Sequence, residues 1–182
     1  MKINAIHKNR EQIFQIAESR AKGYNFYPGE DISKVIEKQK GKIIPQDFCE
    51  WQFSNSIIVH GRNKDIRFTI YISNFTGPLR DRFTLAHALG HYVLHSNEGQ
   101  KEITAARFKS DCTSKSEKLA YIQANQFASA FLMPKDKFKK VWIDTEHDVI
   151  LIAGLFLVPV LAVEMCANDL KLTHTPYKVK EN

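Results

Sequence analysis

The stretch RFTLAHALGHYVLH (residues 82–95) decides how this chain is interpreted, because it spaces histidines four residues apart. In an α-helix of about 3.6 residues per turn, residues i and i+4 lie on one face. His87 and His91 can therefore both direct an imidazole nitrogen at one metal ion. His95 continues the series. A single straight helix cannot wrap three ligands around an ion, so we expect His95 to pack against or cap the helix end.

The composition is that of a globular protein of the cytoplasm. The chain has 182 residues, of which 43% are hydrophobic and 25% charged, which is enough for one domain, or one domain with a small appendage, around a sizeable core. Its three cysteines, Cys49, Cys112 and Cys166, are far apart and form no CxxC pair. An odd, scattered set favours a reducing compartment, and residues 1–14 contain no apolar signal-like run.

Neither the charge nor the apolar tail predicts a nucleic-acid or membrane partner. The net charge is +6, but the lysines are spread out and are explained by a solvated surface, so direct nucleic-acid binding is not expected. The apolar run VILIAGLFLVPVLAV (residues 149–163) is interrupted by Pro159. At about 1.5 Å per helical residue it is too short for a bilayer core of roughly 30 Å. We predict two short buried helices there and no membrane span.

The hydrophobic periodicity predicts an α+β fold in which helices carry the chemistry. The predicted elements are helices over 3–24 and 31–41, strands over 42–48, 55–61 and 65–73, the histidine helix, a helix over 117–133, and two short helices within 147–172. A polar connection rich in Ser, Thr and Lys follows the histidine helix. In the helix over 117–133 we expect four core positions: Leu119, Ile122, Phe127 and Phe131.

Two motifs together resemble the ImmA/IrrE family of zincin-type metallopeptidases. That family's first motif reads like RFTxAHELGHxxLH and its second like ExxANxFAxxLLMP. RFTLAHALGHYVLH (residues 82–95) is similar to the first, and EKLAYIQANQFASAFLMP (residues 117–134) to the second. The resemblance implies a zincin-like domain over residues 1–134, with N-terminal helices, a small sheet and two motif helices. Residues 135–182 would form a helical C-terminal segment packed on the same core.

The family resemblance also implies a cofactor and a partner. Members hold zinc with the two motif histidines, here His87 and His91, and with a glutamate from the second helix. The glutamate of the first motif acts as general base. Known members act on helix-turn-helix repressors of mobile elements or damage-response genes, and relatives occur in toxin–antitoxin pairs with an Xre-type partner. The resemblance therefore implies such a repressor or antitoxin as the partner.

This chain departs from the family pattern at both glutamates. The general-base position is Ala88, and the third-ligand position, four residues before Asn125, is Tyr121. A phenol has a pKa near 10 and is a poor zinc ligand. Glu117 and His95 are the alternative third ligands, although neither matches the pattern. By the i, i+4 spacing, we expect Asn125 to hydrogen-bond a metal-binding histidine.

The missing base predicts little or no peptidase activity. General acid–base catalysis contributes about 10²–10⁴ in rate, and an alanine side chain cannot move a proton. Ala88 is consistent either with a deliberate Glu→Ala change or with natural loss of activity, and the second difference, at Tyr121, favours natural loss. Two functions stay open: an impaired zinc metallopeptidase that acts on a helix-turn-helix partner, and a non-catalytic pseudo-metallopeptidase that acts by binding an Xre-type protein.

Overall fold

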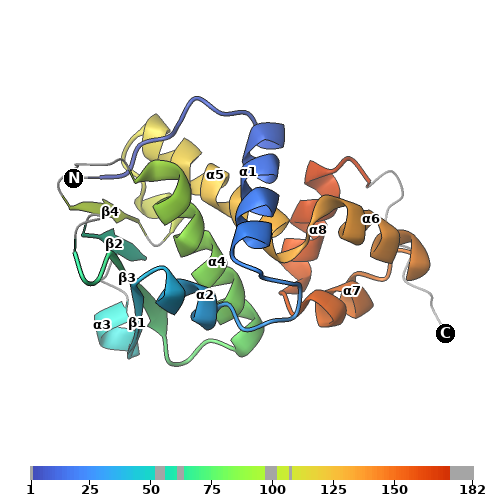
Figure 1. Ribbon diagram of the computed structural model, residues 1–182, viewed down its shortest axis with the longest axis horizontal. Coiled ribbons are helices and arrows are strands. Elements are labelled where there is room, and N and C mark those ends of the chain that lie inside the picture. The colour runs from blue at the N-terminus through green and yellow to red at the C-terminus, as the bar shows by residue number, and fades with distance from the viewer. Residues whose placement is uncertain (1, 52–55, 61–63, 97–101, 107, 173–182) are drawn as a thin grey trace.

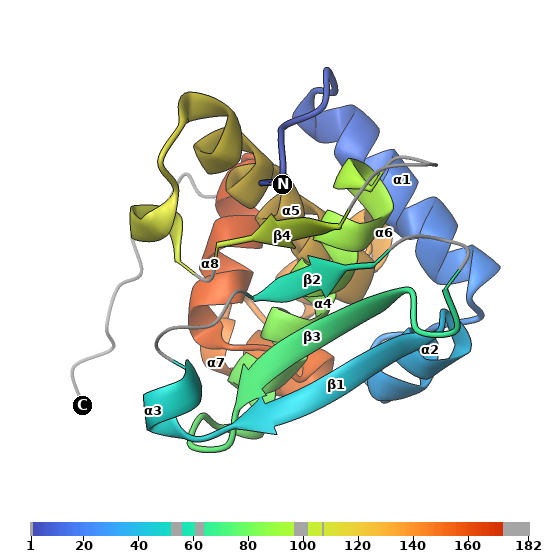
Figure 2. The same cartoon turned by 90° about the vertical axis from the view of Figure 1, so that its left-hand side faces the viewer.

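A mixed β-sheet forms one side of the molecule (Figure 2). The computed structural model describes residues 2–51, 56–60, 64–96, 102–106 and 108–172. Within these residues the strands are β1 (Gly41–Gln46), β2 (Ile57–Val59), β3 (Phe68–Ser73) and β4 (Ile103–Ala105), in the order β1-β3-β2-β4. β1 runs parallel to β3, whereas β2 is antiparallel to both β3 and β4. The predicted α+β class is therefore confirmed.

The sheet differs from the prediction at its β4 edge. The polar connection after the histidine helix contains β4, whose Ile103 and Ala105 are buried while Thr104 is only partly so. Three residues are too few for the alternation to stand out from the surrounding polar residues. At the other edge, Gly41 is required because a Cβ there would lie 2.4 Å from the Phe68 ring.

The first helix begins later than predicted. α1 (Arg10–Gly23) starts after Asn9, whose side chain accepts a hydrogen bond from the Gln12 backbone in a reciprocal capping box. Residues 2–8 instead form no helix; Lys2 makes an isolated bridge to Thr104 of β4, and the Ile3 N–H donates to the Thr104 carbonyl at 3.0 Å. α2 (Ser33–Lys38) lies within its predicted range, and the short α3 (Phe48–Trp51) was not predicted.

The two motif helices pack directly against each other (Figure 1). They are α4 (Pro78–His95) and α5 (Lys115–Leu132), and α1 also lies against α5. Gly90 permits their close approach, because a Cβ there would lie 3.0 Å from the Phe127 ring and 3.1 Å from the Ala124 carbonyl oxygen. This packing brings the histidine face of α4 to the polar side chains of α5.

Phe127 and Phe131 of α5 lie in the core as predicted, whereas Leu119 does not. Leu119, in the second turn of α5, is 48% exposed, whereas Ala120 and Gln123 beside it on the helix are buried. Ile122 is only half-buried. Helical spacing identifies a face but does not say how far along it neighbouring helices extend.

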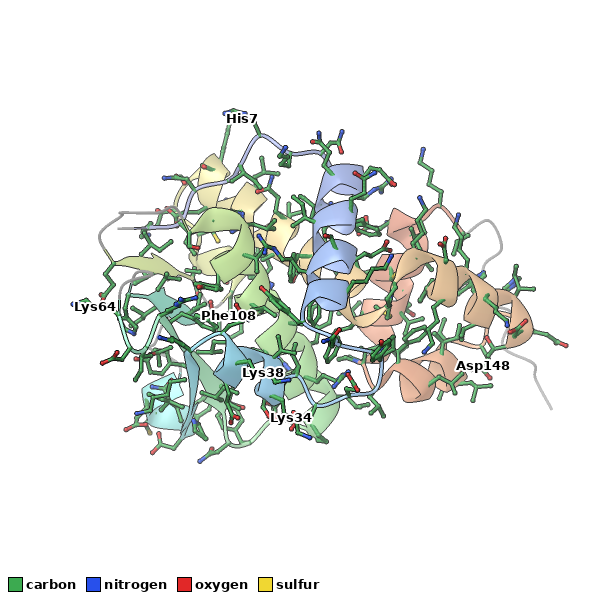
Figure 3. The ribbon with its side chains drawn as sticks, viewed as in Figure 1. His7, Lys34, Lys38, Lys64, Phe108 and Asp148 are labelled. Atoms are coloured by element: carbon green, nitrogen blue, oxygen red, sulfur yellow. The ribbon has the colours of Figure 1, made fainter. Side chains whose placement is uncertain are left out.

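Within the described part of the chain, three helices follow α5 and share its apolar core. They are α6 (Lys135–Asp144), α7 (Val149–Phe156) and α8 (Val160–Asp169), and they contribute Phe138, Phe156 and Val163 to the main buried cluster. Asp148, labelled in Figure 3, caps α7 by accepting from the Ile150 and Leu151 backbones. Residues 173–182 of the expected C-terminal segment lie outside the described residues.

No single helix among the described residues is long and apolar enough to cross a membrane. α7 and α8 reach that length and composition only when they are taken together. The two helices are bent by 103° at the break between Phe156 and Val160.

Candidate metal centre

Three imidazoles form a continuous buried row along α4. Nε2 of His87 lies 3.1 Å from Nε2 of His91, and Nδ1 of His91 lies 3.1 Å from Nδ1 of His95. The three residues are 6%, 2% and 5% exposed, respectively. The i, i+4 spacing thus produces the convergence of His87 and His91 that it predicts, and adds a direct contact from His91 to His95.

The His95 end of the row is closed by Gln123 of α5. Nε2 of His95 lies 3.1 Å from the Gln123 side-chain oxygen. The same oxygen accepts the Ile6 backbone N–H at 3.1 Å, while the Gln123 amide nitrogen donates to the Ile6 carbonyl at 2.8 Å. This pair of bonds to one backbone residue fixes which end of the amide faces His95, so His95 meets an oxygen, which can only accept.

The fixed amide determines the tautomers along the row. His95 must carry its proton on Nε2 in order to donate to Gln123, so a neutral His95 presents a lone pair on Nδ1. His91 must then donate from Nδ1 to His95, which leaves a lone pair on His91 Nε2. That lone pair points at His87.

At the His87 end the row meets Asn125 of α5. Nδ1 of His87 lies 2.7 Å from the Asn125 side-chain oxygen and donates to it, so a neutral His87 also has its lone pair on Nε2. Two lone pairs therefore face each other across the 3.1 Å between His87 and His91. A metal ion or a proton at that point would relieve the repulsion between the two lone pairs.

The electrostatics of the row favour neutral imidazoles. Burial lowers the pKa of His87 to about 4, against the raising effect of its Asn125 hydrogen bond. Burial likewise lowers the pKa of His95 to about 4 and that of His91 well below its usual value. Burial disfavours the imidazolium form, so near neutral pH these groups are metal-type donors rather than cations.

The donor set fits a metal ion only in part. When two imidazole nitrogens bind one zinc ion at about 2.0–2.1 Å with a tetrahedral N–Zn–N angle, they lie about 3.3 Å apart. This distance is close to the 3.1 Å between the Nε2 atoms of His87 and His91. A catalytic zinc site needs a third protein ligand. Among the described residues no group of three His, Cys, Asp or Glu side chains is placed to hold an ion.

The third-ligand position is filled by an unsuitable phenol. The Tyr121 ring lies 4.7 Å from the His87 ring, centroid to centroid, so α5 does bring this residue to the site. Burial raises the pKa of Tyr121, which keeps its hydroxyl protonated. The side chain therefore adds an aromatic wall beside His87 rather than a negative ligand.

Neither alternative third ligand joins His87 and His91. Glu117 accepts from the Thr113 backbone N–H at 3.2 Å and the Thr113 hydroxyl at 2.9 Å, at the start of α5. Both ring nitrogens of His95 are engaged, one with His91 and one with Gln123. Ala88, at the general-base position, is fully buried and offers only a methyl group.

A cavity of about 430 Å³ opens beside His87. Its wall combines polar residues of α4 with apolar residues of α8, and it includes Arg80, His87, Tyr121, Asn125, Leu161 and Met165. Leu161 is 65% exposed, so the apolar wall continues onto the surface. The cavity reaches only one end of the imidazole row, because His91 and His95 are not part of its lining.

The remaining described histidines are separate from the row. His60 contacts the Thr69 hydroxyl at 2.9 Å, and His147 stacks on Trp142. His7 lies at the surface on the segment before α1, as Figure 3 shows.

Comparison with known proteins places the chain in a family. The family model described as the IrrE N-terminal-like domain matches residues 48–167, a span that contains both motif helices and the sheet residues beside them. The chain belongs to this family. The resemblance to ImmA/IrrE metallopeptidases is thereby confirmed. No curated protein matches the chain.

A solved structure supports the family fold. A Mycobacterium tuberculosis transcriptional regulator matches with a TM-score of 0.59 and 18% sequence identity, over 87% of this chain and 46% of that one. At this identity the likeness shows the fold alone. The chain spans less than half the length of that regulator.

The contribution of Gln123 and Ile6 was not anticipated from the sequence. Gln123 stands two residues before Asn125 on α5, at a position without a metal-ligand motif. Residues 3–8 were expected to be helical, so nothing indicated that the Ile6 backbone reaches α5. The spare i+4 histidine, His95, was the only available sign that the row continues past the metal-binding pair.

Proposed function

We propose that this IrrE-family protein acts on a helix-turn-helix repressor or antitoxin of the Xre type by binding it rather than by efficient cleavage. The observation that carries the proposal is the imidazole pair without a carboxylate: Ala88 replaces the general base and Tyr121 replaces the third ligand. Membership of the IrrE family supports a helix-turn-helix protein as the partner, and the solved structure with a similar fold is that of a transcriptional regulator. Mobile-element control, toxin–antitoxin pairing and stress regulation are the settings that this partner implies.

We also propose that His87 and His91 bind one divalent metal ion, zinc being the first choice. The support is the pair of facing lone pairs, since imidazole nitrogens are good ligands for zinc. A metal ion bound there would supply Lewis-acid polarisation of a substrate carbonyl. With only two protein ligands we expect weaker binding than in a complete site, and loss of metal with strong chelators.

The residues around the cavity suit binding better than proton transfer. Asn125 holds the His87 ring in place, and Tyr121, Leu161 and Met165 give the cavity an apolar and aromatic wall. Ala88 itself is not among the described residues that line the cavity. Asp81 also lines the cavity, but its carboxylate accepts a hydrogen bond from the Thr76 hydroxyl. The cytoplasm suits such a protein, since Cys49, Cys112 and Cys166 are all free thiols.

The proposal is tested with an Xre-type helix-turn-helix protein, taken from beside this chain's gene if one is encoded there. The wild-type protein should form a complex with it and leave it uncut in the presence of zinc. The double variant Ala88→Glu/Tyr121→Glu restores both carboxylates and should gain cleavage. Cleavage by the wild-type chain at a comparable rate would contradict the binding mode, and the absence of a complex would contradict the partner class.

A matched pair of surface variants locates the contact. Leu161→Glu places a charge at the cavity rim, on a residue that is 65% exposed. The control, Ile143→Glu, places a charge on a residue that is 70% exposed and does not line the cavity. We expect Leu161→Glu to weaken the complex at least about tenfold, as a charge desolvated at an apolar contact would. Ile143→Glu should leave it unchanged. Equal effects would place the contact elsewhere.

A further inference from the structure

The Gln123 side chain is buried, 2% exposed, and lies between two parts of the molecule that are distant in sequence. On one side it holds the backbone of residues 2–8, donating to the Ile6 carbonyl at 2.8 Å and the Lys8 carbonyl at 3.4 Å. On the other side its oxygen faces His95 at 3.1 Å. All polar groups of this amide are therefore engaged.

The segment of residues 2–8 is itself docked at several points. The Ile3 N–H donates to the Thr104 carbonyl of β4 at 3.0 Å, and the Ala5 N–H donates to the Ser116 hydroxyl at 3.0 Å. The Ile3 side chain is 3% exposed. The segment is thus held by the sheet edge and by α5 independently of Gln123, which makes its Ile6 backbone a firm reference for the amide.

We infer that Gln123 is a positioning residue that links the docked segment of residues 2–8 to the lone pair of His91. The Ile6 backbone sets the direction of the Gln123 amide, the amide oxygen sets the tautomer of His95, and His95 sets the tautomer of His91. A reversed amide would present a donor to His95. It would move the proton of His95 to Nδ1 and that of His91 to Nε2. His91 would then carry its proton on Nε2 and could not bind a metal ion there.

The alternative is that Gln123 only fills space and anchors the segment. These two roles separate in suitable variants. The donor end of the amide only anchors the segment, at the Ile6 and Lys8 carbonyls, whereas the oxygen both accepts the Ile6 N–H and faces His95. Gln123→Leu removes both. Gln123→Glu keeps an oxygen that accepts from His95, whether or not the carboxyl is protonated. Ser116→Ala loosens the segment at Ala5 and leaves the imidazole row untouched.

The direct test reads tautomers by long-range ¹H–¹⁵N NMR of the metal-free full chain labelled at histidine nitrogens. In the wild type, His91 should be the Nδ1–H form and His95 the Nε2–H form. Gln123→Leu should shift His91 towards Nε2–H, whereas Gln123→Glu and Ser116→Ala should keep the wild-type pattern. A wild-type His91 in the Nε2–H form, or an unchanged His91 in Gln123→Leu, overturns the inference.

A second readout is the affinity for zinc or cobalt, measured by competition with a chromophoric chelator. Loss of a residue that orients a metal-binding histidine typically weakens binding by roughly 10- to 100-fold, and we expect this for Gln123→Leu. Gln123→Glu should stay within about threefold of the wild type or bind more tightly, as carboxylate–histidine–metal contacts do. Equal losses in the Leu and Ser116→Ala variants would assign Gln123 an anchoring role only.

This second readout rests on the metal binding proposed above, whereas the tautomers do not. Wild-type protein that binds no metal but shows the expected His91 tautomer contradicts the metal proposal and supports the positioning role. If Gln123→Leu fails to fold, as judged by circular dichroism, the wild-type tautomers and the Gln123→Glu variant still decide the matter.

Discussion

The two ends of the imidazole row differ in how completely they are built. At the inner end, His91 and His95 are buried, and every ring nitrogen of His95 has a hydrogen-bond partner in Gln123 or His91. At the outer end, His87 borders the cavity, and its surroundings contain Tyr121 and Ala88 where the family has carboxylates. The residues that orient the imidazoles are present, whereas the two positions of the family's carboxylates hold an alanine and a tyrosine, and this difference supports the binding role proposed above.

The largest effect is expected from removing one of the two converging imidazoles. His87→Ala leaves His91 as the single remaining lone-pair donor, so we expect metal affinity to fall at least about 100-fold. His60→Ala is the control, because His60 lies outside the row and contacts Thr69. Isothermal titration with zinc measures both. Equal affinities of His87→Ala and the wild type would place the metal elsewhere.

The neutral row should make the metal-free protein sensitive to acid. The folded-state pKa of His87 and of His95 is about 4, below the unfolded value near 6.5, so the unfolded chain binds protons first as pH falls. Stability is complete above about pH 6.5 and falls between there and pH 4, by about 3 kcal/mol for one such imidazole. Urea unfolding in chelator at several pH values measures this fall.

His95→Gln supplies the control for the acid prediction. It removes one buried imidazole, so the difference in unfolding free energy between neutral and acidic pH should shrink. A wild-type stability that is flat from pH 7 to about pH 4.5 would show that the row is already protonated or solvated, against the burial of these residues.

Restoring the base alone should destabilise the metal-free chain. Ala88 is fully buried, so Ala88→Glu buries a carboxyl group without a partner, and we expect a loss of about 2 kcal/mol in unfolding free energy. Ala88→Gln has nearly the same size without the charge and separates packing from charge. Zinc should reduce the loss in the Glu variant. An unchanged stability would indicate that position 88 faces open, solvated space.

A glycine pair tests the spacing between the two motif helices. Gly90→Ala adds a methyl 3.0–3.1 Å from Phe127 and from the Ala124 carbonyl, whereas Gly154→Ala, in α7, meets nothing within 4 Å. Overpacking costs about 1–3 kcal/mol and outweighs a gain of up to about 1 kcal/mol in helix propensity. We therefore expect Gly90→Ala to lose about 1 kcal/mol and Gly154→Ala to gain about 0.5 kcal/mol. Thermal denaturation compares them, and a stabilised Gly90→Ala would contradict the tight contact.

The sequence allowed the local features of the site to be predicted better than its long-range ones. The i, i+4 spacing predicts that His87 and His91 converge, because this relation depends on a single helix. That Tyr121 and Asn125 of α5 face them was predicted from the resemblance of the second motif to the family. The role of Gln123 depends on the Ile6 backbone, 117 residues away in the sequence. Ile6 lies in a segment whose apolar spacing wrongly predicted a helix. β4 was missed for a similar reason, since its pairing with β2 rather than its own composition makes it a strand.

We propose above all that the imidazoles of His87 and His91 bind one metal ion through converging lone pairs, without a carboxylate ligand. X-ray absorption at the zinc edge of the full chain carrying one equivalent of zinc tests it most directly. We predict two imidazole nitrogens at about 2.0–2.1 Å, with the remaining ligands being water oxygens, and the loss of one nitrogen in His87→Ala. A shell that contains a protein carboxylate, or zinc that shows no imidazole ligands, would contradict the account.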